Sequence, residues 1–302
     1  MLTDNMRGAL LMMASMAAFT MNDAFMKTLA GDMPLFQLIF LRSILTTSAI
    51  GAMALYLGAL HLRIPPRDRL LIVIRAVAEI GSAYFFLTAL YNMPLANVSA
   101  IMQSLPLVVT LAAAMFFAEP LGWRRMTAIL VGLCGVLLIV RPGTEGFTVF
   151  SVYALIAVAF VTVRDLVTRR VSGATHSMMV TFITSVGLLI AFGFASLTVE
   201  WVPLTPHRAS MTLGAGVMVV FGYVFSVMVM RVGEISFVAP FRYTGLIWAL
   251  VLGWLVFGDW PAPLTLVGAV IVVGSGVFML YREGQLKRRI AAEAKLRTGF
   301  GD

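Results

Sequence analysis

Hydrophobic stretches long enough to cross a bilayer follow one another along the whole chain. A membrane-spanning helix needs about 20 mostly apolar residues. Charged residues, prolines and glycines divide the sequence into ten such stretches: 8–28, 36–58, 70–91, 95–117, 124–140, 148–168, 177–198, 211–230, 236–257 and 264–281. The connections between them are short and leave no room for a soluble domain. The pattern therefore predicts an all-α membrane protein with ten transmembrane helices.

The composition excludes an ordinary soluble domain. Apolar residues make up 60% of the 302 positions and charged residues only 12%, and so little charge could not cover a soluble surface. Arg7 and the apolar run after it resemble a signal peptide, but Asn22, Asp23 and Lys27 follow where a small-residue cleavage site would stand. We expect this first segment to be retained. The single cysteine, Cys134, allows no intrachain disulfide or thiolate metal cluster.

The basic residues predict the orientation in the membrane. With an even number of spans, both termini share one side. That side carries Arg7, Arg63, Arg67, Arg69, Arg124, Arg125, Arg169, Arg170, Arg231, Arg282, Lys287, Arg288, Arg289, Lys295 and Arg297. The opposite loops carry only Arg141 and Arg208, with Lys27 near a helix end. The positive-inside rule then places both termini in the cytoplasm. It also explains the net charge of +8 without nucleic acid as a partner, and residues 284–302 are expected to form a solvated basic tail.

The two halves of the chain resemble each other. At an offset near 140 residues, Phe117-Ala118-Glu119 matches Phe257-Gly258-Asp259, and Asp23-x-x-x-Lys27 corresponds to Asp165-x-x-x-Arg169. The halves, residues 1–143 and 144–283, hold five predicted spans each. Because five is odd, the second half must be inverted relative to the first. Inverted repeats are common in secondary transporters, whose substrate site lies near the midplane between them.

These features together resemble the EamA family of the drug/metabolite transporter superfamily. The resemblance rests on the spans, on the stretch from Pro94-Leu95-Ala96-Asn97-Val98-Ser99-Ala100 to Phe117-Ala118-Glu119-Pro120, and on its counterpart from Val238-Ala239-Pro240 to Phe257-Gly258-Asp259-Trp260-Pro261. It implies a bacterial-type inner-membrane transporter without a cofactor, whose cavity is lined mainly by the third, fourth, eighth and ninth segments. The family includes exporters of amino acids and other metabolites and some importers. Export of an amino acid or related metabolite is the expectation, and uptake of an aromatic vitamin such as riboflavin is the alternative.

Ionisable residues inside the predicted spans are functional candidates because they are expensive in hydrocarbon. Arg75 and Glu79 are four residues apart on one helix face, so they form either an ion pair or part of a site. Glu79 is expected to set any dependence on a proton as coupling ion. Arg42 and Arg242 also lie within spans. Since Pro240 favours an irregular helix entry, Arg242 is a candidate anchor for a carboxylate or carbonyl group.

Two further charged pairs lie toward helix ends. Asp23 with Lys27, and Asp165 with Arg169, have the spacing of pairs one turn apart. A structural pair or a gate latch is favoured over proton coupling for both, and Arg75 is grouped with them as a gate candidate.

Polar and aromatic side chains on the implied cavity helices are candidate substrate contacts. Ser99, Gln103 and Thr110 form a stripe interrupted by Pro106, where a kink is expected. The aromatic candidates are Tyr84 and Trp248. Interhelical hydrogen bonding and packing are the alternative uses of the same residues.

Other classes of function are less well supported. Gly274-Ser275-Gly276 resembles a serine-nucleophile turn, but the histidines fall in or beside loops and could not activate it: His61, His176 and His207. The sequence contains no phosphate-binding glycine motif. Its 20 methionines are consistent with adaptable packing and do not indicate metal transport. The expected partners are a small-molecule substrate and the lipid bilayer, with the chain a monomer or a homodimer.

Overall fold

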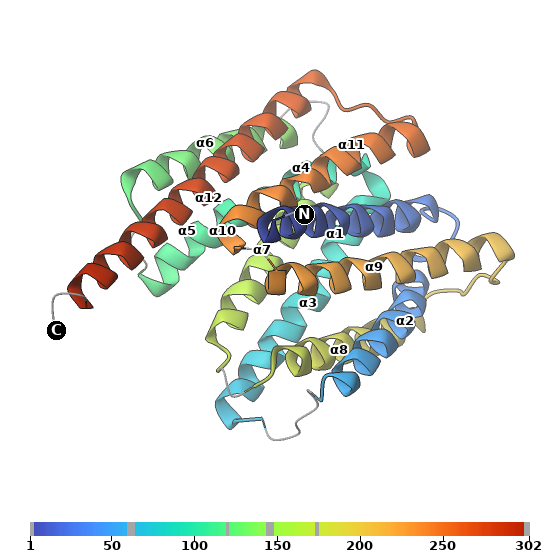
Figure 1. Ribbon diagram of the computed structural model, residues 1–302. Helices are drawn as coiled ribbons and strands as arrows, with labels where there is room; N and C mark the ends of the chain where they lie inside the picture. Colours follow the sequence, from blue (N-terminus) through green and yellow to red (C-terminus); the bar gives the residue numbers. More distant parts are fainter. Residues whose placement is uncertain are drawn as a thin grey trace.

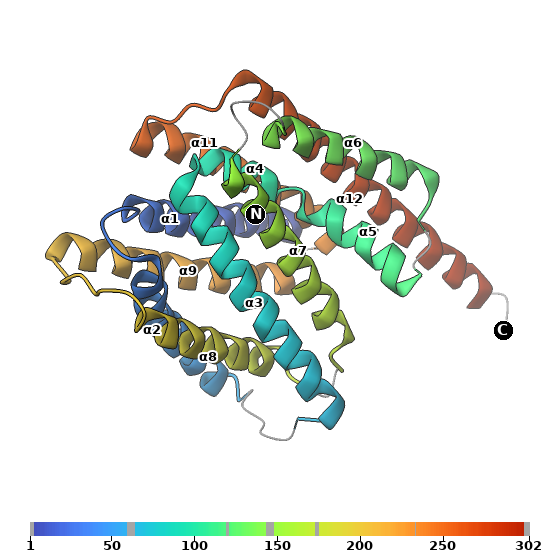
Figure 2. The ribbon, with the colours of Figure 1, turned by 180° about the vertical axis from the view of Figure 1, so that it is seen from behind.

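The computed structural model is built of helices joined by short loops (Figures 1 and 2). It describes residues 3–58, 64–118, 121–142, 148–172, 175–232 and 234–298, of which only the backbone is described at 230–231, 235–236, 283 and 286–298. Glu119, Pro120 and His61 lie outside these ranges. The helices are α1 (Asp4–Thr28), α2 (Leu35–Tyr56), α3 (Pro66–Asn92), α4 (Leu95–Met102), α5 (Leu105–Phe117), α6 (Trp123–Val140), α7 (Val149–Arg170), α8 (Ser177–Ser196), α9 (Pro206–Val232), α10 (Ile235–Val238), the 3₁₀ helix η1 (Ala239–Tyr243), α11 (Thr244–Phe257) and α12 (Pro263–Thr298).

The predicted number of spans is confirmed. Within the described residues, ten helical segments are long and apolar enough to cross a membrane. Eight of them correspond to single helices, whereas α4 with α5 forms one span and η1 with α11 forms another. The chain is therefore a multi-pass membrane protein.

The two interrupted spans are broken where the sequence predicts. α4 ends at Met102 and α5 begins at Leu105, with Pro106 in its first turn. Pro240 lies in η1, which precedes the regular helix α11. Proline lacks a backbone donor and clashes with the preceding turn, so a continuous α-helix is disfavoured at both places.

The helices pack in pairs that join the two halves of the chain. α1 lies along α9 and α3 along α7, while α2 packs against α8 and α6 against α12 (Figures 1 and 2). If each helix is replaced by its equivalent in the other half, the α1–α9 pair becomes the α7–α3 pair. The α2–α8 and α6–α12 pairs each map onto themselves. This is the pairing expected of two five-helix repeats, and their inversion stays a prediction.

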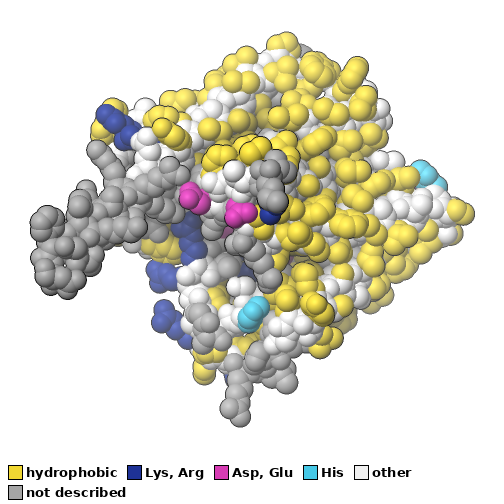
Figure 3. Space-filling view, in the orientation of Figure 1, with side chains coloured by type: hydrophobic (Ala, Val, Ile, Leu, Met, Phe, Trp, Pro, Cys, Tyr) yellow, Lys and Arg dark blue, Asp and Glu magenta, His cyan; other side chains and the backbone are white. Residues whose placement is uncertain are grey.

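The surface separates apolar from basic side chains. Hydrophobic side chains cover most of the face seen in Figure 3, and Lys and Arg side chains gather along its left edge. That edge is the one toward which α12 extends in Figure 1. The backbone of the predicted tail, 284–302, continues α12 as a helix as far as Thr298.

A close crossing of helices joins α6 to α12 through two glycines. A Cβ added to Gly135 would lie 2.8 Å from the carbonyl oxygen of Gly268, and one added to Gly268 would lie 2.6 Å from the carbonyl oxygen of Gly135. Membrane helices approach this closely only through small residues.

We therefore expect Gly268→Ala to lower the unfolding temperature in detergent, because the new methyl group meets a backbone oxygen that cannot move aside. The destabilisation should be about 1–3 kcal/mol. Gly274→Ala is the matched control, since a Cβ at Gly274 of the same helix meets no atom within 4 Å. Equal effects of the two substitutions would contradict the crossing.

Candidate functional site

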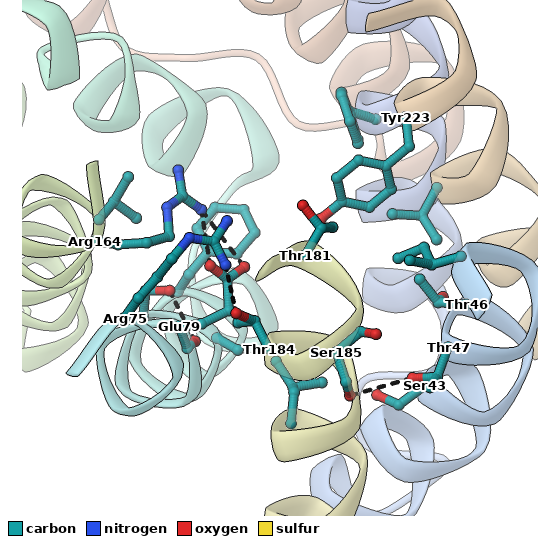
Figure 4. A pocket seen from close by; sticks show the side chains of 18 of the residues that line it. Ser43, Thr46, Thr47, Arg75, Glu79, Arg164, Thr181, Thr184, Ser185 and Tyr223 are labelled. Atoms are coloured by element: carbon teal, nitrogen blue, oxygen red, sulfur yellow. Dashed lines mark hydrogen bonds and ion pairs between the residues drawn. The ribbon is translucent and has the colours of Figure 1, made fainter. Parts of the chain in front are cut away.

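A cavity of about 470 Å³ lies among α2, α3, α7, α8 and α9. Phe19 of α1 and Met102 of α4 complete its lining. Figure 4 shows two unlike walls, one with charged side chains from α3 and α7 and one with hydroxyl groups from α2, α8 and α9.

The charged wall is organised by Arg164 of α7. Its Nη1 lies 3.2 Å from Oε2 of Glu79 on α3, and its Nη2 lies 2.9 Å from Oδ1 of Asp165. The three side chains are 20–35% exposed, so they face the cavity without being in bulk solvent. A charge at this depth requires a partner, and Arg164 supplies one to both carboxylates.

Beside this cluster, Arg75 of α3 forms hydrogen bonds with two other helices. Its Nε donates to Oγ1 of Thr168 on α7 at 2.9 Å, and its Nη1 donates to Oγ1 of Thr184 on α8. Arg75 and Glu79 do share one face of α3, but the partners in these bonds come from other helices (Figure 4). The hydrogen-bond partners of Arg75 are neutral, and its positive charge interacts with Glu79 one turn along the same helix.

The opposite wall is rich in hydroxyl groups, each of which can donate and accept. α2 contributes Ser43, Thr46 and Thr47, α8 contributes Thr181, Thr184 and Ser185, and α9 contributes Tyr223 (Figure 4). Thr47 donates to the carbonyl oxygen of Ser185 at 3.2 Å, which joins the two helices. Such a wall can bind polar groups of many shapes.

Arg42 contributes a third guanidinium to the cavity. Its Nη1 donates to Oδ1 of Asn22 at 3.1 Å, and Nδ2 of Asn22 donates to Oδ1 of Asp23 at 2.9 Å. Within the described residues, Nε of Arg42 and Oγ of Ser43 are buried without a protein partner. Buried polar groups are normally hydrogen-bonded, so these two atoms stand out among the residues that line the cavity.

The cavity is closed at one end of the bundle. There Nε2 of the fully buried Gln37 donates to the carbonyl oxygen of Val202 at 2.9 Å. The backbone N–H of Val202 donates to Oε1 of Gln37 at 3.0 Å. Nζ of Lys27 donates to the carbonyl oxygens of Leu90 and Met93 at 3.2 and 2.6 Å, at the end of α3. An apolar cluster fills the space between these bonds: Met26, Leu29, Leu38, Ile39, Leu90 and Leu95.

The lining reaches further in the opposite direction. Met53 lies within one turn of the end of α2, and Met178 lies in the first turn of α8. The cavity therefore extends toward one face of the bundle and is sealed from the other.

The structure brings four of the candidates predicted from the sequence together. The residues that line the cavity are Arg42, Arg75, Glu79 and Asp165. Asp165 forms an ion pair with Arg164. Arg169, the partner expected from the sequence, is exposed near the end of α7. Asp23 accepts from Asn22, and Lys27 bonds the carbonyl groups at the end of α3.

The remaining predicted contacts lie elsewhere. Tyr84 packs against Phe36 and Phe85. The other four belong to the fourth and ninth spans, where they are half-buried: Ser99, Gln103, Arg242 and Trp248. None of these five is among the described residues that line the cavity.

The helices that line the cavity differ from those implied by the resemblance. α3 and α9 take part as implied, but the fourth span contributes only Met102 and the ninth contributes no described lining residue. The reason is packing, because α4 and α11 lie against each other and Nε2 of Gln103 lies within 3.3 Å of a Cβ added to Gly245. α2, α7 and α8 take their places.

The spacing of Ser and Thr residues in the sequence indicates the hydroxyl wall, although the hydropathy pattern alone does not reveal it. Ser43 and Thr47 are four residues apart, as are Thr181 and Ser185, in otherwise apolar segments. That spacing places each pair on one helix face.

The chain is similar to known membrane transporters. Residues 6–141 and 149–281 match the model of the EamA-like transporter family. The chain is 26% identical to the pseudopaline exporter CntI of Pseudomonas aeruginosa over 276 residues, and this alignment covers 88% of this chain and 93% of that protein. It is 28% identical over 215 residues to a riboflavin transporter of Vibrio cholerae, covering 70% and 72% of the two chains.

Two further similarities extend over almost the whole chain. An S-adenosylmethionine uptake transporter of Rickettsia conorii is 22% identical over 287 residues, covering 91% of this chain and 92% of that protein. A solved crystal structure has the same fold with a TM-score of 0.62 and 18% identity, over 90% of this chain and 96% of the other. The family is one of transporters and not of enzymes, as the sequence predicts.

The pairing in the charged wall makes a prediction about stability. Arg164→Gln leaves Glu79 and Asp165 without their shared partner, so the protein should lose about 1–3 kcal/mol, between the values for exposed and buried pairs. Arg75→Gln is the comparison, because it removes hydrogen bonds to neutral hydroxyl groups and a charge near Glu79 but leaves both ion pairs of Arg164 in place. Thermal unfolding in detergent measures both, and an Arg164→Gln variant at least as stable as Arg75→Gln would contradict the assignment.

Proposed function

The chain belongs to the EamA-like transporter family, and we propose that it is a secondary transporter that moves a small organic metabolite by alternating access. The observation that carries this proposal is the cavity of about 470 Å³, which holds charged groups of both signs and is sealed toward one face of the bundle. In the proposed cycle, the contacts at the sealed end would separate while the other end closes.

The substrate we propose is an amino acid or a related compound that carries both a carboxylate and an amine. Arg42 would bind the carboxylate, because its guanidinium lines the cavity and its Nε has no hydrogen-bond partner within the described residues. Glu79 would attract the amine across the cavity. Export is the first reading of direction, supported by the similarity to the pseudopaline exporter.

Uptake of riboflavin is the second candidate. It is supported by the similarity to the riboflavin transporter of Vibrio cholerae and by three aromatic side chains that line the cavity: Phe19, Phe86 and Tyr223. A flat ring system would stack on such side chains.

We further propose that the protein resides in a bacterial-type inner membrane with both termini in the cytoplasm. The distribution of Lys and Arg along the sequence supports this orientation. The cavity would then extend toward the cytoplasm, where an exported substrate enters. The protein would act as a monomer or a homodimer, with a proton as the candidate coupling ion.

Metabolite profiling followed by reconstitution tests the proposal. Deletion and overexpression strains are compared by untargeted metabolite analysis, and the compound that responds oppositely in the two strains is offered to purified protein in vesicles. We expect saturable flux of that compound, with accumulation inside the deletion strain if the direction is export. Folded protein that moves no member of a broad metabolite library would overturn the proposal.

Glu79 should carry the dependence of flux on pH. Glu79→Gln replaces the carboxylate by a neutral amide of similar shape, so the variant should transport with a flat pH profile while binding stays measurable. Asp165→Asn is the control, because Asp165 contacts the same Arg164. An unchanged pH profile in Glu79→Gln, or flattening by Asp165→Asn alone, would contradict the assignment.

Arg42 should act as the anchor through its planar fork of donors. Arg42→Lys keeps the charge but loses the fork, so the apparent affinity should fall about tenfold, the value of one charge-assisted hydrogen bond. Arg242→Lys is the matched comparison, since Arg242 was the anchor expected from sequence and is not among the cavity-lining residues. Loss of affinity in Arg242→Lys with normal affinity in Arg42→Lys would reverse the assignment.

A further inference from the structure

A second hollow lies on the outside of the bundle, between α6 and α12. It is a groove of about 460 Å³, lined on α6 by Trp123, Arg124, Thr127, Ala128 and Val131 and on α12 by Gly274, Ser275 and Phe278. None of these residues lines the central cavity. Figures 1 and 2 show α6 and α12 side by side at the edge of the bundle.

The groove is a consequence of how the two helices cross. They touch where Gly135 meets Gly268 and separate toward the start of α6. The floor is formed where a Cβ on Gly132 would approach Cβ of Ser275 to 3.1 Å. Gly274 leaves the space above this floor open, because a Cβ there would meet no atom within 4 Å.

The groove has the length of one membrane leaflet. From Trp123 to Val131 the helix rises about 12 Å, whereas half of a hydrocarbon core is about 15 Å thick. Trp123 marks the interfacial end, since it begins α6 and its side chain is 72% exposed. Tryptophan is typical of that level of the membrane.

The polar character of the groove is concentrated at the same end. The Arg124 guanidinium carbon lies 5.2 Å from the centre of the Trp123 ring, and the rest of the lining is apolar apart from two hydroxyl groups. A cation at the interface followed by an apolar channel one leaflet long matches an amphipathic anion. We propose that the groove binds one anionic phospholipid, with its phosphate at Arg124 and an acyl chain lying over Gly274.

A second copy of the chain fits the groove less well. A two-fold dimer places the same surface of both copies together. Two concave grooves would face each other and leave a void, and the Arg124 side chains of both copies would enter one interface. The groove therefore favours a lipid as its occupant.

Native mass spectrometry tests the proposal on the full-length protein in detergent. The probe is an equimolar mixture of phosphatidylglycerol and phosphatidylethanolamine. We expect wild type to retain one phosphatidylglycerol in preference, and Arg124→Gln to reduce that preference about fivefold, the effect of one basic residue near an anionic headgroup. Gly274→Leu should fill the groove and displace lipids of both kinds.

Two controls separate the groove from general effects. Arg67→Gln removes an exposed cation near the start of α3, and Val270→Leu adds bulk to an exposed position of α12 outside the groove. Both should bind phosphatidylglycerol as wild type does. The proposal is overturned if wild type shows no preference, if Gly274→Leu keeps its lipid, if Arg67→Gln loses as much as Arg124→Gln, or if the groove variants change the oligomeric state instead of lipid binding.

Discussion

A charged side chain inside the bilayer must find a partner, and this constraint determines the arrangement of the central helices. Arg164 is paired with Glu79 across the boundary between α7 and α3. Arg75 extends the same connection to α8 through the hydroxyl group of Thr184. Because separating Glu79 from Arg164 would break a partly buried ion pair, α3 and α7 are expected to move together. The hydroxyl-bearing wall on α2 and α8 is bound by weaker neutral bonds.

The contacts that hold the bundle together are accordingly of two kinds. At the glycine crossing of α6 and α12, the two backbones approach so closely that an added methyl group would meet a carbonyl oxygen. At the sealed end of the cavity, Gln37 and Lys27 bond to backbone groups that water could satisfy equally well. Opening that end would exchange these protein bonds for water bonds, and its main cost would be the exposure of the apolar cluster around them. The fold thus combines a fixed contact at its edge with exchangeable contacts at the end of its cavity.

The sequence predicts the elements of this fold better than their contacts. Hydropathy gives the spans, and Pro106 and Pro240 give the interruptions, because these are properties of single helices. The spacing of Arg75 and Glu79 identifies a common face but not the helix opposite, so Arg164 could not be recognised as the partner. Serine and threonine were overlooked on α2 and α8 because they commonly bond to their own backbone in membrane helices, as Thr46 does to the carbonyl oxygen of Arg42.

Substrate protection of a single introduced cysteine tests most directly whether this cavity is the transport site. The natural Cys134 is exposed and is first replaced by serine. Ser185→Cys in that background lines the hydroxyl wall, whereas Ser99→Cys lies in the fourth span outside the described lining. With the transported metabolite at saturation, thiol labelling in vesicles should slow at position 185 and stay unchanged at position 99. Protection at position 99 with none at position 185 would place the substrate between the fourth and ninth spans and contradict the account.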